Sequence, residues 1–114
     1  MAGRLRFSGP FAGYFLFFIP RALSLSLAAD FLGKDEGGIS QDHVTGTVKE
    51  IINMIAGSTF SNYDDSEVFR LDLPELVGLD EALGDDPDSE EMLFIAIETP
   101  DDKLALKMVK KRDG

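Results

Sequence analysis

Glu50 and Asn53 are the two residues whose types and spacing best suit chemistry on a shared surface. They lie in a stretch whose apolar residues recur with the period of an α-helix, so side chains three positions apart are neighbours. Gly46 and Gly57 fall on the same helix face. A helix-interior glycine costs about 1 kcal/mol relative to alanine, and these two flatten the face. A flat strip with one carboxylate and one carboxamide suits close approach of another protein's backbone, whereas ordinary solvated helix residues can show the same spacing.

The composition excludes several kinds of site. The chain has 114 residues and contains no cysteine and one histidine, His43. Disulfide scaffolds, zinc–thiolate sites, cysteine nucleophiles and dyads of two histidines are therefore excluded. His43 lies near the start of the same helix, on the flank of its exposed face. We interpret it as a solvated helix residue, with a pH-sensitive contact as the alternative.

Charge narrows the choice of partner. Eleven basic and twenty-one acidic residues give a net charge of −10, and the resulting field repels phosphate backbones, so nucleic acid is not expected to bind. The acidic segment 84–91 lacks the alternating ligands, the glycine and the distal glutamate of an EF-hand loop, so we interpret it as a solvated loop and expect no metal site. Gly37-Gly38 is not followed by the lysine and serine of a P-loop.

The first thirty residues have features of a secretion signal. Arg4 and Arg6 precede an apolar run at 11–19, and Ala28-Ala29 follow. A turn cluster before the run and Pro20-Arg21 after it favour folded elements instead. No run of about 20 unbroken apolar residues is present, so a membrane span is not expected. We expect a cytoplasmic location.

The periodicity predicts an α+β fold, with two helices packed on a largely antiparallel five-stranded sheet. The predicted strands are 5–8, 13–19, 67–77, 92–99 and 103–110. The strand at 92–99 is expected in the centre of the sheet. The lysine-bearing strand at 103–110 is expected at its edge, because lysine discourages sheet-to-sheet pairing.

The helices are predicted at 20–32 and from Ser40, as the N-cap, to about Phe60. The second helix carries an apolar stripe expected to face the core: Val44, Val48, Ile51, Ile52, Ile55 and Thr59.

The segment 50–57, Glu-Ile-Ile-Asn-Met-Ile-Ala-Gly, resembles the E-x-x-N signature of the CheC/CheX/FliY chemotaxis phosphatases, and most closely its CheX form. Other motifs agree in order: Phe-Ser-Gly at 7–9, Gly13 before an apolar strand, Phe-Leu-Gly at 31–33, Leu73-Pro74, Val77-Gly78 and the hairpin at 98–102. The resemblance covers about residues 5–109. A single signature favours the CheX type, since CheC and FliY types usually carry two.

The resemblance implies a phosphatase for the aspartyl phosphate of a CheY-like response regulator. Asn53 would orient the attacking water, and Glu50 would pair with the regulator's active-site lysine. The domain would need no cofactor of its own, because the regulator brings the phosphoaspartate and its Mg²⁺. Gly46 and Gly57 are expected at the partner-binding surface.

Two departures from the family pattern motivate an alternative function. Family members commonly place Asp or Ser where this chain has Gly46. The chain is expected to be a single domain over 1–114 that lacks the N-terminal segment usual in CheX-type chains. The alternative is a non-catalytic CheX-like interaction module that binds a receiver domain or another protein. A homodimer through an exposed terminal strand is also compatible with the sequence, although lysines on that strand would oppose it.

Overall fold

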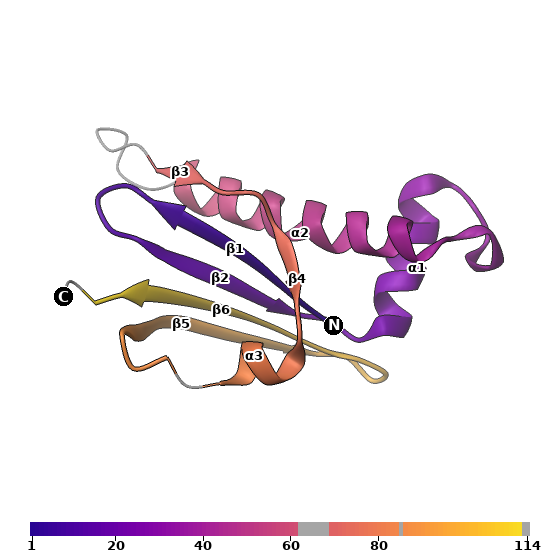
Figure 1. The fold of residues 1–114 in the computed structure, drawn as a ribbon. Helices are drawn as coiled ribbons and strands as arrows, with labels where there is room; N and C mark the ends of the chain where they lie inside the picture. The colour runs from indigo at the N-terminus through magenta and orange to yellow at the C-terminus, as the bar shows by residue number, and fades with distance from the viewer. Residues whose placement is uncertain (62–68, 85, 113–114) are drawn as a thin grey trace.

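The fold is an antiparallel sheet with the longer of two main helices along one face and the other packed against that helix at the end of the sheet, which confirms the predicted α+β class (Figure 1). The computed structural model describes residues 1–61, 69–84 and 86–112. In these ranges the strands are β1 (Ala2–Ser8), β2 (Gly13–Phe18), β3 (Arg70–Leu71), β4 (Glu75–Val77), β5 (Ser89–Glu98) and β6 (Lys103–Lys111). The helices are α1 (Arg21–Leu32), α2 (Gln41–Ser61), the short α3 (Leu79–Leu83) and the 3-10 turn η1 (Glu36–Gly38).

Six strands make a sheet five strands wide, in the order β3-β1-β2-β6-β5. The sheet is only five strands wide because β3 and β4 pair with opposite ends of the same strand, β1. Phe7 pairs with Leu71 of β3, and Gly3 pairs with Leu76 of β4. The strand predicted at 67–77 is therefore two short strands, interrupted before Pro74, which has no N–H to donate to a ladder. Residues 67–68 of that prediction lie outside the described residues.

The predicted positions of the last two strands are wrong. The lysine-bearing strand β6 is internal, paired with β2 on one side and β5 on the other, and β5 is the edge strand. Alternating lysine and apolar residues mark a strand with one solvated face, and that pattern fits an internal strand as well as an edge. Lys107 is half-buried beside β2. A lysine in such a place can bury its aliphatic stem and extend its ammonium to water, so it is compatible with an internal strand.

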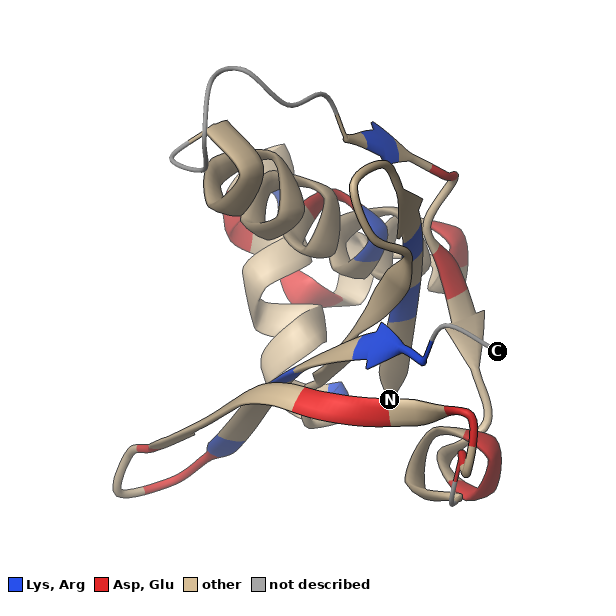
Figure 2. Cartoon of the chain, turned by 90° about the vertical axis from the view of Figure 1, so that its left-hand side faces the viewer, with Lys and Arg blue, Asp and Glu red and all other residues tan. Residues whose placement is uncertain are grey.

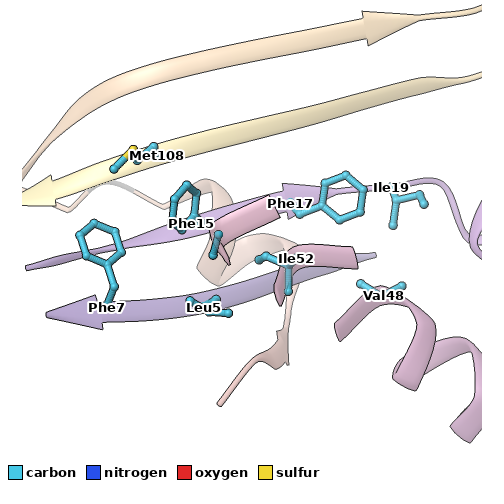
Figure 3. Close-up of a cluster of buried hydrophobic side chains, with 9 residues drawn as sticks. Leu5, Phe7, Phe15, Phe17, Ile19, Val48, Ile52 and Met108 are labelled. Carbon is cyan, nitrogen blue, oxygen red and sulfur yellow. The ribbon is translucent and has the colours of Figure 1, made fainter. Parts of the chain in front are cut away.

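The hydrophobic core lies between α2 and the β1–β2–β6 part of the sheet (Figure 3). Its buried side chains are Leu5, Phe7, Phe15, Phe17, Ile19, Val48, Ile52, Ala56 and Met108. Along α2 the predicted stripe is buried at Val44, Val48 and Ile52, half-buried at Ile51 and Ile55, and exposed at Thr59. The stripe holds over the first four turns, so it fixes which face of α2 points outward.

Contacts between aromatic rings stabilise the C-terminal end of α2 against β1 and the segment before β3. Phe60 stacks on Phe69 with ring centroids 4.1 Å apart, and Phe7 meets Phe60 edge-on at 4.9 Å. Aromatic pairs of this geometry contribute about 0.5–1.5 kcal/mol beyond their buried area. These contacts hold the long helix against β1 and the chain that enters β3.

The apolar run near the N-terminus forms β2, which is covered on both faces. Phe15 and Phe17 point to the helix layer, and Leu16 packs with Ala2 and Ala82 on the side of α3. No helix in the described ranges is both long enough and apolar enough to cross a membrane.

Polar contacts hold α3 and the following loop on the sheet face opposite α2. The Arg4 guanidinium donates to Glu75 at 2.8 Å and to Glu81 at 3.0 Å, which ties β4 and α3 to β1. The Tyr14 hydroxyl donates to the Asp86 carboxylate at 3.1 Å. Burial, together with that carboxylate, raises the pKa of Tyr14, so the hydroxyl keeps the proton that it donates.

Gly13 is the position where a side chain is least compatible with the fold. A Cβ there would overlap the backbone carbonyl oxygen of Val109 and lie 2.9 Å from the Phe7 ring. Gly13→Ala should therefore lower the free energy of unfolding by about 3 kcal/mol, because the β2–β6 ladder must separate locally. Urea unfolding measures the effect. Gly37→Ala is the control, since its Cβ would meet nothing within 4 Å, and equal midpoints for both variants would contradict the described register.

Candidate functional site

Helix α2 begins with a reciprocal cap that fixes its first turn. The Ser40 hydroxyl accepts a hydrogen bond from the His43 N–H at 3.2 Å, and the Ser40 N–H donates to His43 Nδ1 at 3.2 Å. This confirms Ser40 as the start of the helix. It also gives half-buried His43 a capping role that the sequence did not reveal.

Gly46, Glu50, Asn53 and Gly57 all lie on the exposed face of α2, opposite the buried Val48 and Ile52. Within the described part of the chain, the side chains of Glu50 and Asn53 form no hydrogen bond or ion pair. Both are therefore available to a partner, held on a helix whose inner face is fixed in the core. Their roles stay predictions.

Three exposed apolar side chains near this face were not among the predicted site residues. Met54, next to Asn53, is 59% exposed, and Phe31 and Leu32, at the end of α1, are 58% and 44% exposed. Phe31 and Leu32 belong to the Phe-Leu-Gly motif at 31–33, which contributes to the family resemblance. The sequence does not show that they lie beside α2.

A shallow groove of about 300 Å³ lies beside Glu50. Helix α1 contributes Phe31 and Leu32 to its lining, and α2 contributes Asp42, His43, Gly46, Thr47 and Glu50. The groove and the Glu50–Asn53 face therefore form one continuous surface.

Packing does not explain the two glycines on this face. A Cβ built at Gly46 or at Gly57 would meet nothing within 4 Å. An alanine would fit both sites and would suit a helix better. The absence of side chains keeps the surface low on either side of Glu50 and Asn53.

Gly46→Ala and Gly57→Ala are each expected to raise the free energy of unfolding by about 1 kcal/mol, since alanine favours a helix interior. If both glycines admit a partner's backbone, the same variants should bind that partner several-fold more weakly. Thermal unfolding and titration with the partner measure the two effects. A variant that is stabilised and binds as well as wild type would contradict a role for that glycine.

The exposed face can position a partner's reacting groups. A carboxamide both donates and accepts hydrogen bonds, which suits Asn53 to holding a water molecule in one orientation. A carboxylate such as Glu50 pairs with a cation. Within residues 1–61, 69–84 and 86–112, no three His, Asp or Glu side chains converge as a metal site would need.

Solved structures share this fold at low sequence identity. A chain of the CheX–CheY–BeF3–Mg²⁺ complex from Borrelia burgdorferi has a TM-score of 0.76 at 15% identity, with 97% of this chain and 75% of that chain covered. A CheC-like protein from Shewanella oneidensis gives 0.72 at 18% identity, covering 96% of this chain and 72% of that chain. CheX from Vibrio vulnificus gives 0.69 at 18% identity, with 96% and 74% covered.

No curated protein sequence matches the chain. The model of the family described as chemotaxis phosphatase CheX matches residues 1–98. Because this match covers most of the chain and the described fold agrees with solved CheX structures, the protein belongs to the CheX family.

Proposed function

We propose that this protein accelerates hydrolysis of the aspartyl phosphate of a CheY-like response regulator. The observation that carries the proposal is the exposed, outward-facing pair Glu50 and Asn53 on α2, flanked by two glycines, in a chain of the CheX family. A structural relative was solved in a complex with CheY, BeF3 and Mg²⁺, which supports a CheY-like partner. We further propose that residues 1–114 form one domain, which acts in the cytoplasm.

In the proposed reaction, Asn53 holds a water molecule in line with the phosphorus atom. The water oxygen forms a bond to phosphorus, and the bond from phosphorus to the aspartate oxygen breaks. The products are orthophosphate and a free carboxylate, and the proton lost by the water passes to phosphate or solvent. Phosphoryl transfer depends mainly on positioning and electrostatic stabilisation, so one carboxamide on a rigid helix can contribute substantially.

Glu50 has a separate task in the proposal. It is three residues before Asn53 and therefore projects from the same exposed ridge. Its carboxylate would pair with the regulator's active-site lysine, which fixes the register in which Asn53 meets the phosphoryl group. In this scheme Mg²⁺ is bound by the regulator.

Turnover distinguishes this function from the alternative, a non-catalytic CheX-like module that binds a receiver domain. A receiver is phosphorylated in the presence of Mg²⁺, and orthophosphate release is followed with the protein at one-tenth of the receiver concentration. The proposal predicts complete dephosphorylation at a rate proportional to protein concentration. Binding without acceleration would favour the interaction module, which the missing Asp or Ser at Gly46 motivates.

We also propose a homodimer that forms through β5. This edge strand exposes Met92, Leu93, Phe94, Ile95 and Ile97, each by 42–54%. Such a contiguous apolar edge favours strand pairing with another chain. The lysines expected to oppose pairing lie on internal β6, so that objection does not apply.

The charges on β5 select a register for the dimer. Glu90 and Glu91 lie near the start of β5 and Glu98 is its last residue, whereas residues 92–97 carry no charge; acidic residues are red in Figure 2. Antiparallel pairing centred on Phe94 would set Glu90 opposite Glu98, which is unfavourable. Pairing centred on Ile95 sets Glu98 opposite Met92 and avoids the repulsion.

The dimer is tested by sedimentation of the wild type and of Phe94→Lys. The wild type is expected to sediment as a dimer and the variant as a monomer, because a lysine on each strand adds charge at the centre of the apolar contact. Leu83→Lys, on α3, is the control, because Leu83 is also exposed and apolar. A monomeric wild type at high concentration would contradict the dimer.

A further inference from the structure

The groove beside Glu50 is bounded by apolar side chains that face solvent. Phe31 is 58% exposed and Leu32 44% exposed, although large apolar side chains are usually buried. Both line the groove together with Gly46, whose missing side chain leaves open space. In this part of the surface, two adjacent apolar residues are presented to solvent next to a residue of the proposed site.

The apolar pair is held in place by the end of α1. Gly33 adopts a left-handed φ of 63°, and its N–H donates to the Asp30 carbonyl at 3.3 Å. The Lys34 N–H donates to the Ala29 carbonyl at 3.0 Å. This hydrogen-bonded helix end fixes the backbone at Phe31 and Leu32, so binding needs to order only their side chains.

Two polar side chains of the groove lining, Thr47 and His43, already form hydrogen bonds at the start of α2. The Thr47 hydroxyl donates to the His43 carbonyl at 2.9 Å, and His43 Nδ1 accepts the Ser40 N–H. The charged side chains that line the groove are Asp42 and Glu50, both acidic and exposed. The groove is therefore apolar with acidic groups on its rim.

We infer that this groove binds an apolar side chain of the receiver domain that lies close to the lysine paired with Glu50. The inference rests on the proposed function and adds to it a second contact, which selects the partner. An apolar group covers Phe31 and Leu32, and the acidic rim favours basic neighbours around it. The groove contributes to recognition and holds no reacting atom.

The test compares Phe31→Ser and Leu32→Ser with Leu83→Ser. All three remove an exposed apolar side chain, and Leu83 lies on α3, on the sheet face opposite α2. Affinity is measured by titration with a receiver carrying beryllofluoride and Mg²⁺, and kcat and KM are measured with the phosphorylated receiver. Thermal unfolding verifies that each variant is folded.

Phe31→Ser and Leu32→Ser are expected to weaken binding about tenfold and to raise KM, while kcat stays the same. Leu83→Ser should behave as wild type. If the wild type dephosphorylates the receiver and both groove variants match it in affinity and KM, the groove inference is wrong and the proposed function stands. A wild type that binds no receiver would overturn both.

Discussion

Asn53→Ala is expected to lower the rate of receiver dephosphorylation at saturating receiver about 100-fold. The alanine removes the group proposed to orient the attacking water, and losses of this size follow removal of one positioned hydrogen-bonding group. Because Asn53 is exposed and its side chain makes no described hydrogen bond, the free energy of unfolding should change by less than about 0.5 kcal/mol. Affinity for the beryllofluoride-bound receiver should also change little.

The matched comparison is Glu50→Gln, which removes the charge and keeps the shape of the side chain. It should weaken receiver binding more than Asn53→Ala does, since Glu50 is proposed to hold the partner's lysine. Asp101→Asn, in the turn between β5 and β6, is the control for loss of one exposed carboxylate. An Asn53→Ala protein with a wild-type rate would show that the water is positioned by another group.

Ile52→Ala is expected to lower the free energy of unfolding strongly, whereas Asn53→Ala should lower the dephosphorylation rate and leave stability almost unchanged. Ile52 is fully buried and packs with Leu5 and Val48 in the main core. The lost methyl groups and the remaining cavity should lower the free energy of unfolding by about 3–4 kcal/mol. Urea unfolding of Ile52→Ala beside Asn53→Ala compares neighbouring residues on opposite faces of α2. Similar stability of the two variants would contradict the described orientation of the helix.

The orientation of α2 could be predicted from the sequence because the apolar residues that recur with the helical period are the ones that the structure buries. Val48 and Ile52 recur with the helical period and are buried, which leaves Glu50 and Asn53 outward. The cap at Ser40 follows from local chemistry in the same way. The face that carries the candidate site was therefore predictable from one helix alone, whereas the roles proposed for its residues come from the resemblance to a family.

The order of strands could not be predicted in this way. The alternation in β6 indicates one solvated face, but it does not tell how many neighbours the strand has. The apolar run in β5 fits a strand buried in the centre of a sheet, yet β5 lies at the edge with Phe94 and Ile97 both 54% exposed. Strand order depends on contacts between segments that are distant in sequence. The hydrophobic periodicity of one strand carries no information about those contacts.

The groove depends on contacts between two helices and was missed for the same reason. Phe31 and Leu32 are separated from Glu50 by the turn η1 and the first turns of α2. Only the packing of α1 against α2 brings these apolar side chains beside the carboxylate. The available signal in the sequence was the Phe-Leu pair directly before Gly33, the glycine that ends the predicted helix.

We propose that the exposed face of α2 is the surface that meets the phosphorylated receiver. The most direct test of this proposal is an NMR titration of the isotope-labelled protein with a receiver carrying beryllofluoride and Mg²⁺. We expect the backbone amide signals of Gly46, Glu50, Asn53 and Gly57 to shift or broaden and those of α3 to stay unchanged. Changes confined to β5, with the signals of α2 unaffected, would contradict it.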